Sequence, residues 1–79
     1  MTITGEQVKA ARQILGWTQS DLGGQTGLSA STIGHFETGK RPLPVRGLSV
    51  IKGVLEGAGV EFSENGEAGP GVGLRKGAK

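Results

Sequence analysis

The chain has 79 residues, nine Lys and Arg against seven Asp and Glu, and no cysteine. This length predicts one small domain whose core is near the lower limit for independent stability, so stabilisation by association with another chain is an open alternative. The absence of cysteine excludes a disulfide framework and thiolate metal sites, and no apolar run is long enough for a signal segment or a membrane span, which predicts a cytoplasmic protein.

The first half of the chain repeats one helix-start signature three times: a hydroxyl residue as N-cap, with apolar residues on both sides that can close over it. The copies are Ile3-Thr4-x-x-Gln7-Val8, Trp17-Thr18-x-x-Asp21-Leu22 and Leu28-Ser29-x-x-Thr32-Ile33. They predict helices over about residues 4–15, 18–25 and 29–37. The second and third begin only eleven residues apart, with a tight connection through Gly27. This arrangement predicts a helix-turn-helix, whose second helix is suited to the DNA major groove.

Apolar spacing predicts which faces of these helices are buried. The expected core positions are Val8, Ala11, Leu15, Leu22, Ile33 and Phe36. We interpret Trp17 as part of this core and not as a stacking group, because it precedes a cap and stands opposite Leu22. Gly23 lies where another backbone can approach closely. Four further glycines at expected helical positions, Gly24, Gly34, Gly47 and Gly53, predict low intrinsic stability.

The second half of the chain begins with a basic loop over residues 38–44. A fourth helix is expected over residues 44–57, with Pro44 in its first turn and Leu48, Ile51 and Leu55 inward. Beyond Gly59, apolar and charged residues alternate over residues 60–62 and again over 72–75, around a turn-forming segment at 63–71. This pattern predicts two short strands in a hairpin, ahead of a basic tail at 76–79.

Two linked runs carry a family resemblance: Arg12-x-x-Leu15-Gly16-Trp17-Thr18-Gln19-x-x-Leu22 and Gly27-Leu28-Ser29-x-x-Thr32-Ile33-x-x-Phe36-Glu37-x-Gly39. Over residues 5–58 the chain resembles the Cro and phage-repressor-like helix-turn-helix family, also called the xenobiotic-response-element type. The expected fold is therefore mainly α, a four-helix repressor-like helix-turn-helix domain at 1–59. A short C-terminal β-hairpin or β-arm with a basic tail follows at 60–79. An isolated two-stranded ribbon is marginal in water, so this segment must either pack on the helices or pair with strands of another copy as a dimerisation element.

The resemblance also implies an ion pair between Arg12 and Glu37 that ties the third helix to the first. The alternative is that both are solvated surface charges. Many family members carry a long amide side chain at the start of the third helix, where this chain has Ala30. Bidentate adenine recognition from that position is therefore not expected.

The DNA-contacting surface is expected to combine three segments. The resemblance implies that Gln19 contacts a phosphate and supports the third helix, and Thr18, which caps the same helix, can join it at the phosphate. The third helix would offer its outward residues to base edges, and the basic loop would lie along the backbone, with Arg46 beside it. A solvated loop and a merely exposed His35 are the alternatives. The predicted DNA-binding residues are Thr18, Gln19, Ser29, Ala30, Ser31, Thr32, His35, Thr38, Lys40 and Arg41.

These features predict a sequence-specific DNA-binding transcriptional regulator, a repressor that binds double-stranded DNA as a homodimer. One alternative is an antitoxin of a toxin-antitoxin module, in which the C-terminal segment would bind a toxin or another protein partner. Another is a helical protein-interaction adaptor, consistent with the small, uncharged outward face of the third helix. A single histidine and no cysteine leave no catalytic constellation, so we predict no enzyme activity, no metal and no cofactor.

Overall fold

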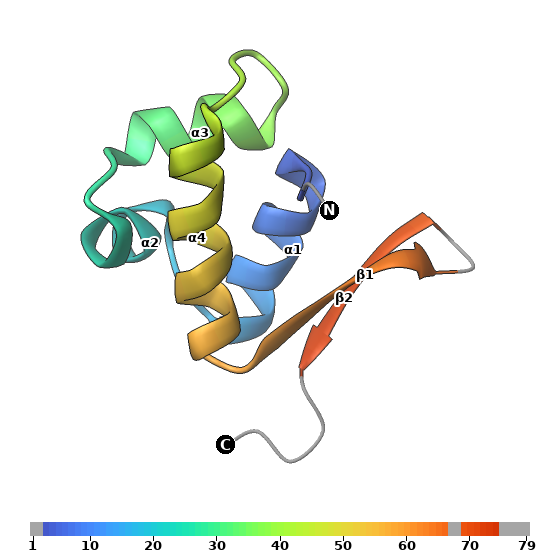
Figure 1. Cartoon of the computed structure of the whole chain (residues 1–79). Coiled ribbons are helices and arrows are strands. Elements are labelled where there is room, and N and C mark those ends of the chain that lie inside the picture. Colours follow the sequence, from blue (N-terminus) through green and yellow to red (C-terminus); the bar gives the residue numbers. More distant parts are fainter. Residues whose placement is uncertain (1–2, 67–68, 75–79) are drawn as a thin grey trace.

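The structure is a computed structural model and describes residues 3–66 and 69–74. Four helices are followed by one hairpin (Figure 1): α1 (Gly5–Leu15), α2 (Gln19–Thr26), α3 (Ala30–Glu37), α4 (Val45–Gly57), β1 (Val60–Gly66) and β2 (Gly69–Leu74). The prediction of a mainly α fold with a C-terminal hairpin is confirmed.

Three hydroxyl residues cap the first three helices at the expected positions. Each side-chain oxygen accepts a hydrogen bond from the backbone N–H three residues on, in the pairs Thr4–Gln7, Thr18–Asp21 and Ser29–Thr32. α1 and α2 end at Gly16 and Gly27, whose φ angles of 73° and 80° are left-handed. Pro44 is the N-cap of α4, one residue before the first turn in which it was expected.

The hairpin is longer than its sequence pattern predicts. Its strands are antiparallel, with Val60 opposite Leu74 and Phe62 opposite Val72, and the register shifts between Ser63 and Gly66. The segment expected as a turn at 63–71 therefore contributes residues 63–66 to β1 and 69–71 to β2. The composition misled the prediction because strands pair through backbone groups, which glycine and polar residues also supply. The tail at 76–79 and position 75 lie outside the described residues.

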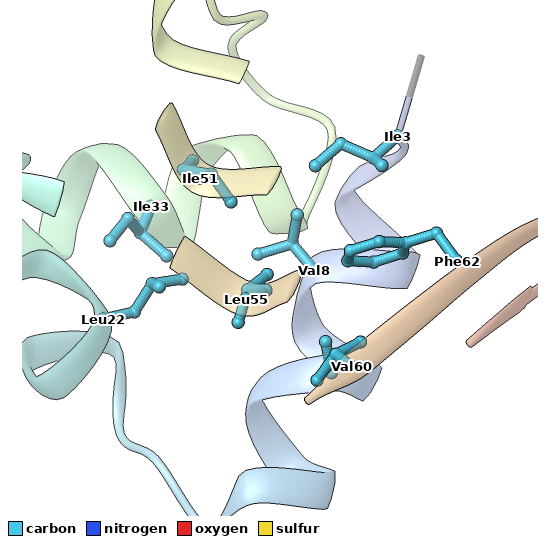
Figure 2. Packing of buried hydrophobic residues seen from close by; sticks show 9 residues of the cluster. Ile3, Val8, Leu22, Ile33, Ile51, Leu55, Val60 and Phe62 are labelled. Carbon is cyan, nitrogen blue, oxygen red and sulfur yellow. The ribbon is translucent and has the colours of Figure 1, made fainter. Parts of the chain in front are cut away.

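One apolar core joins all four helices to the hairpin (Figure 2). β1 contributes Val60 and Phe62, which are 1% and 8% exposed, and Val72 of β2 packs against the same cluster. β1 lies against α4, and β2 lies against α1. The first part of the hairpin is thus built into the helical core. The buried cluster consists of Ile3, Val8, Ala11, Leu22, Ile33, Ile51, Leu55, Val60 and Phe62.

Two glycines allow close packing at the two ends of α3. A β-carbon on Gly23 would lie 2.5 Å from the Leu28 carbonyl oxygen, in the turn that leads into α3. A β-carbon on Gly5 would overlap the Phe36 carbonyl oxygen and lie 2.8 Å from the Glu37 Cα atom, at the other end of the helix. Backbone atoms cannot move aside as a flexible side chain can. The contacts at Gly23 and Gly5 therefore fix the position of α3 relative to α1 and α2.

Candidate nucleic-acid interface

α3 presents one face to solvent and the other to the core. Ile33 is fully buried, whereas Ser31 and His35, one turn apart, are exposed on the outward face. Ala30 and Thr32 are half-buried beside them. The outward face therefore carries short side chains, and His35 is the one that extends furthest from the helix.

Several hydroxyl groups at the predicted site already serve the ends of helices. Ser29 Oγ caps α3 and lies 2.8 Å from Thr32 Oγ1, while Thr18 Oγ1 accepts the Asp21 N–H at 3.0 Å. Thr38 Oγ1 donates to the Gly34 carbonyl at 3.1 Å. A hydroxyl can still accept a further hydrogen bond, but these groups are held by the protein before any ligand arrives.

A partly buried hydrogen-bond network connects three helices. Arg12 Nε and Nη2 donate to the two carboxylate oxygens of Glu37, both at 2.9 Å, and Nη1 donates to the Trp17 carbonyl at 2.9 Å. Gln19 Nε2 donates to Glu37 Oε1 at 3.2 Å. The Arg12 side chain is 12% exposed and that of Glu37 only 1%. The carboxylate at the end of α3 is thus held from α1 and from α2.

The bidentate hydrogen bonds from Arg12 to Glu37 raise the pKa of the Arg12 guanidinium, although its partial burial acts in the opposite direction. A pKa that folding raises stabilises the native state fully below the unfolded-state value, and this contribution is lost only as pH rises through the folded-state value. Both values are strongly alkaline for arginine, so the guanidinium keeps its charge throughout the neutral range.

The Gln19 amide lies directly on the backbone of α3. A β-carbon at Gly34 would be 3.1 Å from Gln19 Nε2, 3.2 Å from Oε1 and 3.4 Å from the amide carbon. The α2 side chain therefore occupies space that a side chain at this point of α3 would need. The sequence did not predict this contact of Gln19 with Gly34, and a glycine in the middle of a short helix was the signal that pointed to it.

The basic loop is tied back onto the C-terminal end of α3. The backbone N–H groups of Lys40 and Arg41 both donate to the His35 carbonyl, at 2.9 and 3.2 Å, and Gly39 has a φ of 79°. Both basic side chains are exposed, as is that of Arg46 in the first turn of α4. None of the three forms an ion pair within residues 3–66 and 69–74. Their charges are therefore available to an anionic partner.

The structure brings the predicted residues into one region that runs from the start of α2, across α3, to the loop before α4. Its centre is the exposed pair Ser31 and His35, and its basic end is formed by Lys40 and Arg41. Gln19 and Thr32 are both half-buried, and their side chains are already hydrogen-bonded within the protein, to Glu37 and to Ser29 respectively.

Two short helices joined at a left-handed Gly27, with the second carrying an exposed face, define a helix-turn-helix protein. The chain matches the family model described as Helix-turn-helix domain over residues 4–69, and it belongs to this family. The resemblance to the Cro and repressor-like class is thereby confirmed, and membership supports a role in DNA binding. A search of the curated proteins finds no match. Among the described helices, none has the length and apolar character needed to cross a membrane.

Proposed function

We propose that this protein is a sequence-specific DNA-binding transcriptional regulator that inserts α3 into the major groove. The observation that carries this proposal is the exposed α3 face next to a loop whose cations have no protein partner among the described residues. An α-helix fits the major groove, where base edges present distinct donors and acceptors. Ser31 and His35 would face those edges, with the Ala30 methyl group available to a thymine methyl.

The phosphate contacts of the proposed complex come from the two sides of α3. Lys40, Arg41 and Arg46 would neutralise phosphates on one side, and the capped N-terminus of α2 at Thr18 would face a phosphate on the other. Because only two exposed side chains on α3 have hydrogen-bonding groups free of contacts within the described chain, direct base recognition is modest. DNA shape and a second half-site would supply the remaining specificity.

We propose further that the protein acts in the cytoplasm as a homodimer and represses by occluding the DNA that it covers. Two copies would place their recognition helices in successive major grooves, about 34 Å apart. The described sheet has only two strands, so each strand keeps an outer edge on which a strand of another copy could pair. On this view the segment 60–79 contributes to dimerisation, while its residues Val60, Phe62 and Val72 also pack in the core.

The test is a charge-neutralising pair of variants. Lys40→Ala with Arg41→Ala should weaken binding to operator-length DNA and reduce the slope of log affinity against log salt by about 2, since each lost phosphate contact changes it by about 0.9. Lys9→Ala, which removes an exposed charge from α1, is the matched control and should leave the slope unchanged. An unchanged slope for the double variant would refute the proposed contacts.

A further inference from the structure

We propose that Thr26 is a positioning residue, whose hydroxyl group accepts the Leu28 N–H and so sets the direction in which the chain leaves α2 and enters α3. The consequence of this bond for DNA recognition rests on the function proposed above. The bond itself is a property of the folded chain, so it can be tested without DNA.

The hydroxyl of Thr26, the last residue of α2, is used both as a donor and as an acceptor. Its Oγ1 donates to the Leu22 carbonyl at 2.9 Å, with the Gly23 carbonyl as a second acceptor at 3.4 Å. The same oxygen accepts the Leu28 N–H at 3.3 Å. A hydroxyl has one proton to donate and lone pairs that accept. One side chain therefore links the last turn of α2 to the residue that follows the turn glycine.

The end of α1 shows how the backbone holds the chain where no such side chain takes part. There the N–H of Trp17, the residue after the left-handed glycine, donates to the Arg12 carbonyl at 2.9 Å. Leu28 has the equivalent place after Gly27, but among the described residues no backbone carbonyl accepts its N–H. The Thr26 hydroxyl thus takes the place of the helix carbonyl that holds the chain at the end of α1.

The connection between α2 and α3 is short, so a single bond within it has a large effect. Only residues 27–29 separate the two helices. Gly27 can adopt many backbone conformations, and its φ of 80° has to be selected by its surroundings. The Leu28 carbonyl oxygen lies so close to α2 that a β-carbon at Gly23 would be 2.5 Å from it. The backbone groups on both sides of Leu28 are therefore held against α2, directly before the Ser29 cap of α3.

Loss of the Thr26 hydroxyl would leave the Leu28 N–H without its acceptor and release one of these two contacts. Base recognition requires that α3 lie accurately in the groove, whereas non-specific binding depends mainly on charge. Removal of the hydroxyl should therefore reduce the affinity for specific DNA more than the affinity for unrelated DNA. This effect requires no contact between Thr26 and DNA.

The first experiment measures amide hydrogen exchange in the full chain by NMR. Thr26→Val removes the hydroxyl and keeps the shape of the side chain, whereas Thr26→Ser keeps the hydroxyl. In Thr26→Val, exchange of the Leu28 amide should become about tenfold faster relative to that of the Trp17 amide, which is bonded to the backbone. In Thr26→Ser, this ratio should stay within about twofold of the wild-type value.

Thr26→Ala also lacks the hydroxyl, and it favours the helix more than valine does. It should therefore behave as Thr26→Val, and it decides the question if Thr26→Val does not fold. An unchanged exchange ratio in a folded variant without the hydroxyl would overturn the proposal, because the hydroxyl would then not hold the turn.

A second measurement tests the consequence for recognition. The affinity of each variant is measured on DNA selected by the wild type from a random pool and on unrelated DNA of equal length. For Thr26→Val, the ratio of the two affinities should fall at least about fivefold, while Thr26→Ser keeps a ratio close to that of the wild type. Gln25→Ala, which changes an exposed neighbour in α2, is the control and should leave the ratio unchanged.

An equal loss on both DNAs for Thr26→Val, or the same fall in the ratio for Thr26→Ser, would overturn the positioning role of the hydroxyl. Failure of the wild type to bind either DNA would refute the proposed function, and the exchange measurement would still decide whether the hydroxyl holds the turn.

Discussion

Replacing Gly5 by alanine tests whether the scaffold determines the position of α3. The new β-carbon would overlap the Phe36 carbonyl oxygen and lie 2.8 and 2.9 Å from the Cα and carbonyl oxygen of Glu37. All three atoms belong to the backbone, so α1 and the end of α3 must separate. Overpacking of this kind costs about 1–3 kcal/mol. For a domain of this size that is a fall of about 5–20 °C in Tm.

Gly24→Ala is the matched control for this prediction. Gly24 is an exposed residue of α2, and a β-carbon there meets nothing within 4 Å. Helix propensity alone should stabilise the protein by about 0.5–1 kcal/mol, which raises Tm by about 3–6 °C. Thermal unfolding followed by circular dichroism measures both variants. The reasoning is refuted if Gly5→Ala is as stable as the wild type, because the close contact between α1 and α3 would then be no constraint.

Three other changes test separate parts of the structure. Arg12→Lys should lower the free energy of unfolding in urea by about 1–3 kcal/mol, because one ammonium group cannot bond both Glu37 oxygens and the Trp17 carbonyl. This loss should be the same across the neutral pH range. A loss that disappears within that range would contradict the proposed importance of the network. His35→Ala should change the base preference at one position of each half-site, altering the free-energy difference between bases there by about 1–3 kcal/mol. The free energy of unfolding should change by no more than about 0.5 kcal/mol. If a repeated selection gives the same base preference, His35 does not belong to the recognition surface. A chain ending at Gly59 should lose cooperative unfolding. Removal of the Phe62 side chain alone costs about 3–5 kcal/mol, out of a total free energy of unfolding of about 4–12 kcal/mol for a domain of this size. A truncated monomer that still unfolds cooperatively would show that the core does not need the hairpin.

The helices could be predicted because their signals are local. A hydroxyl cap with apolar neighbours marks each of the first three helix starts, and Gly16 and Gly27 mark two helix ends. The residue pattern within a few positions of each end was therefore sufficient to predict these helices. The hairpin was harder. Residues 63–66 and 69–71 have the composition of a turn, and their pairing depends on backbone groups that no side-chain pattern reports.

Contacts between elements distant in the sequence were the least predictable part of the site. Arg12 and Glu37 are 25 residues apart, and only the family resemblance suggested that they meet. The Gln19 amide on Gly34 and the overlap of Gly5 with the end of α3 depend on how helices pack, which apolar periodicity does not specify. In the sequence, both contacts are marked only by a glycine in a helix. Such a glycine does not say which neighbour it accommodates until the position of the neighbouring helix is known.

Selection of DNA from a random pool by the full chain tests most directly whether α3 is a recognition helix. If α3 is the recognition helix of a homodimer, the selected DNA should be enriched in a two-fold symmetric sequence whose half-site centres are about 34 Å, or one helical turn, apart. Recovery of DNA with no common sequence, or of no DNA at all, would contradict it.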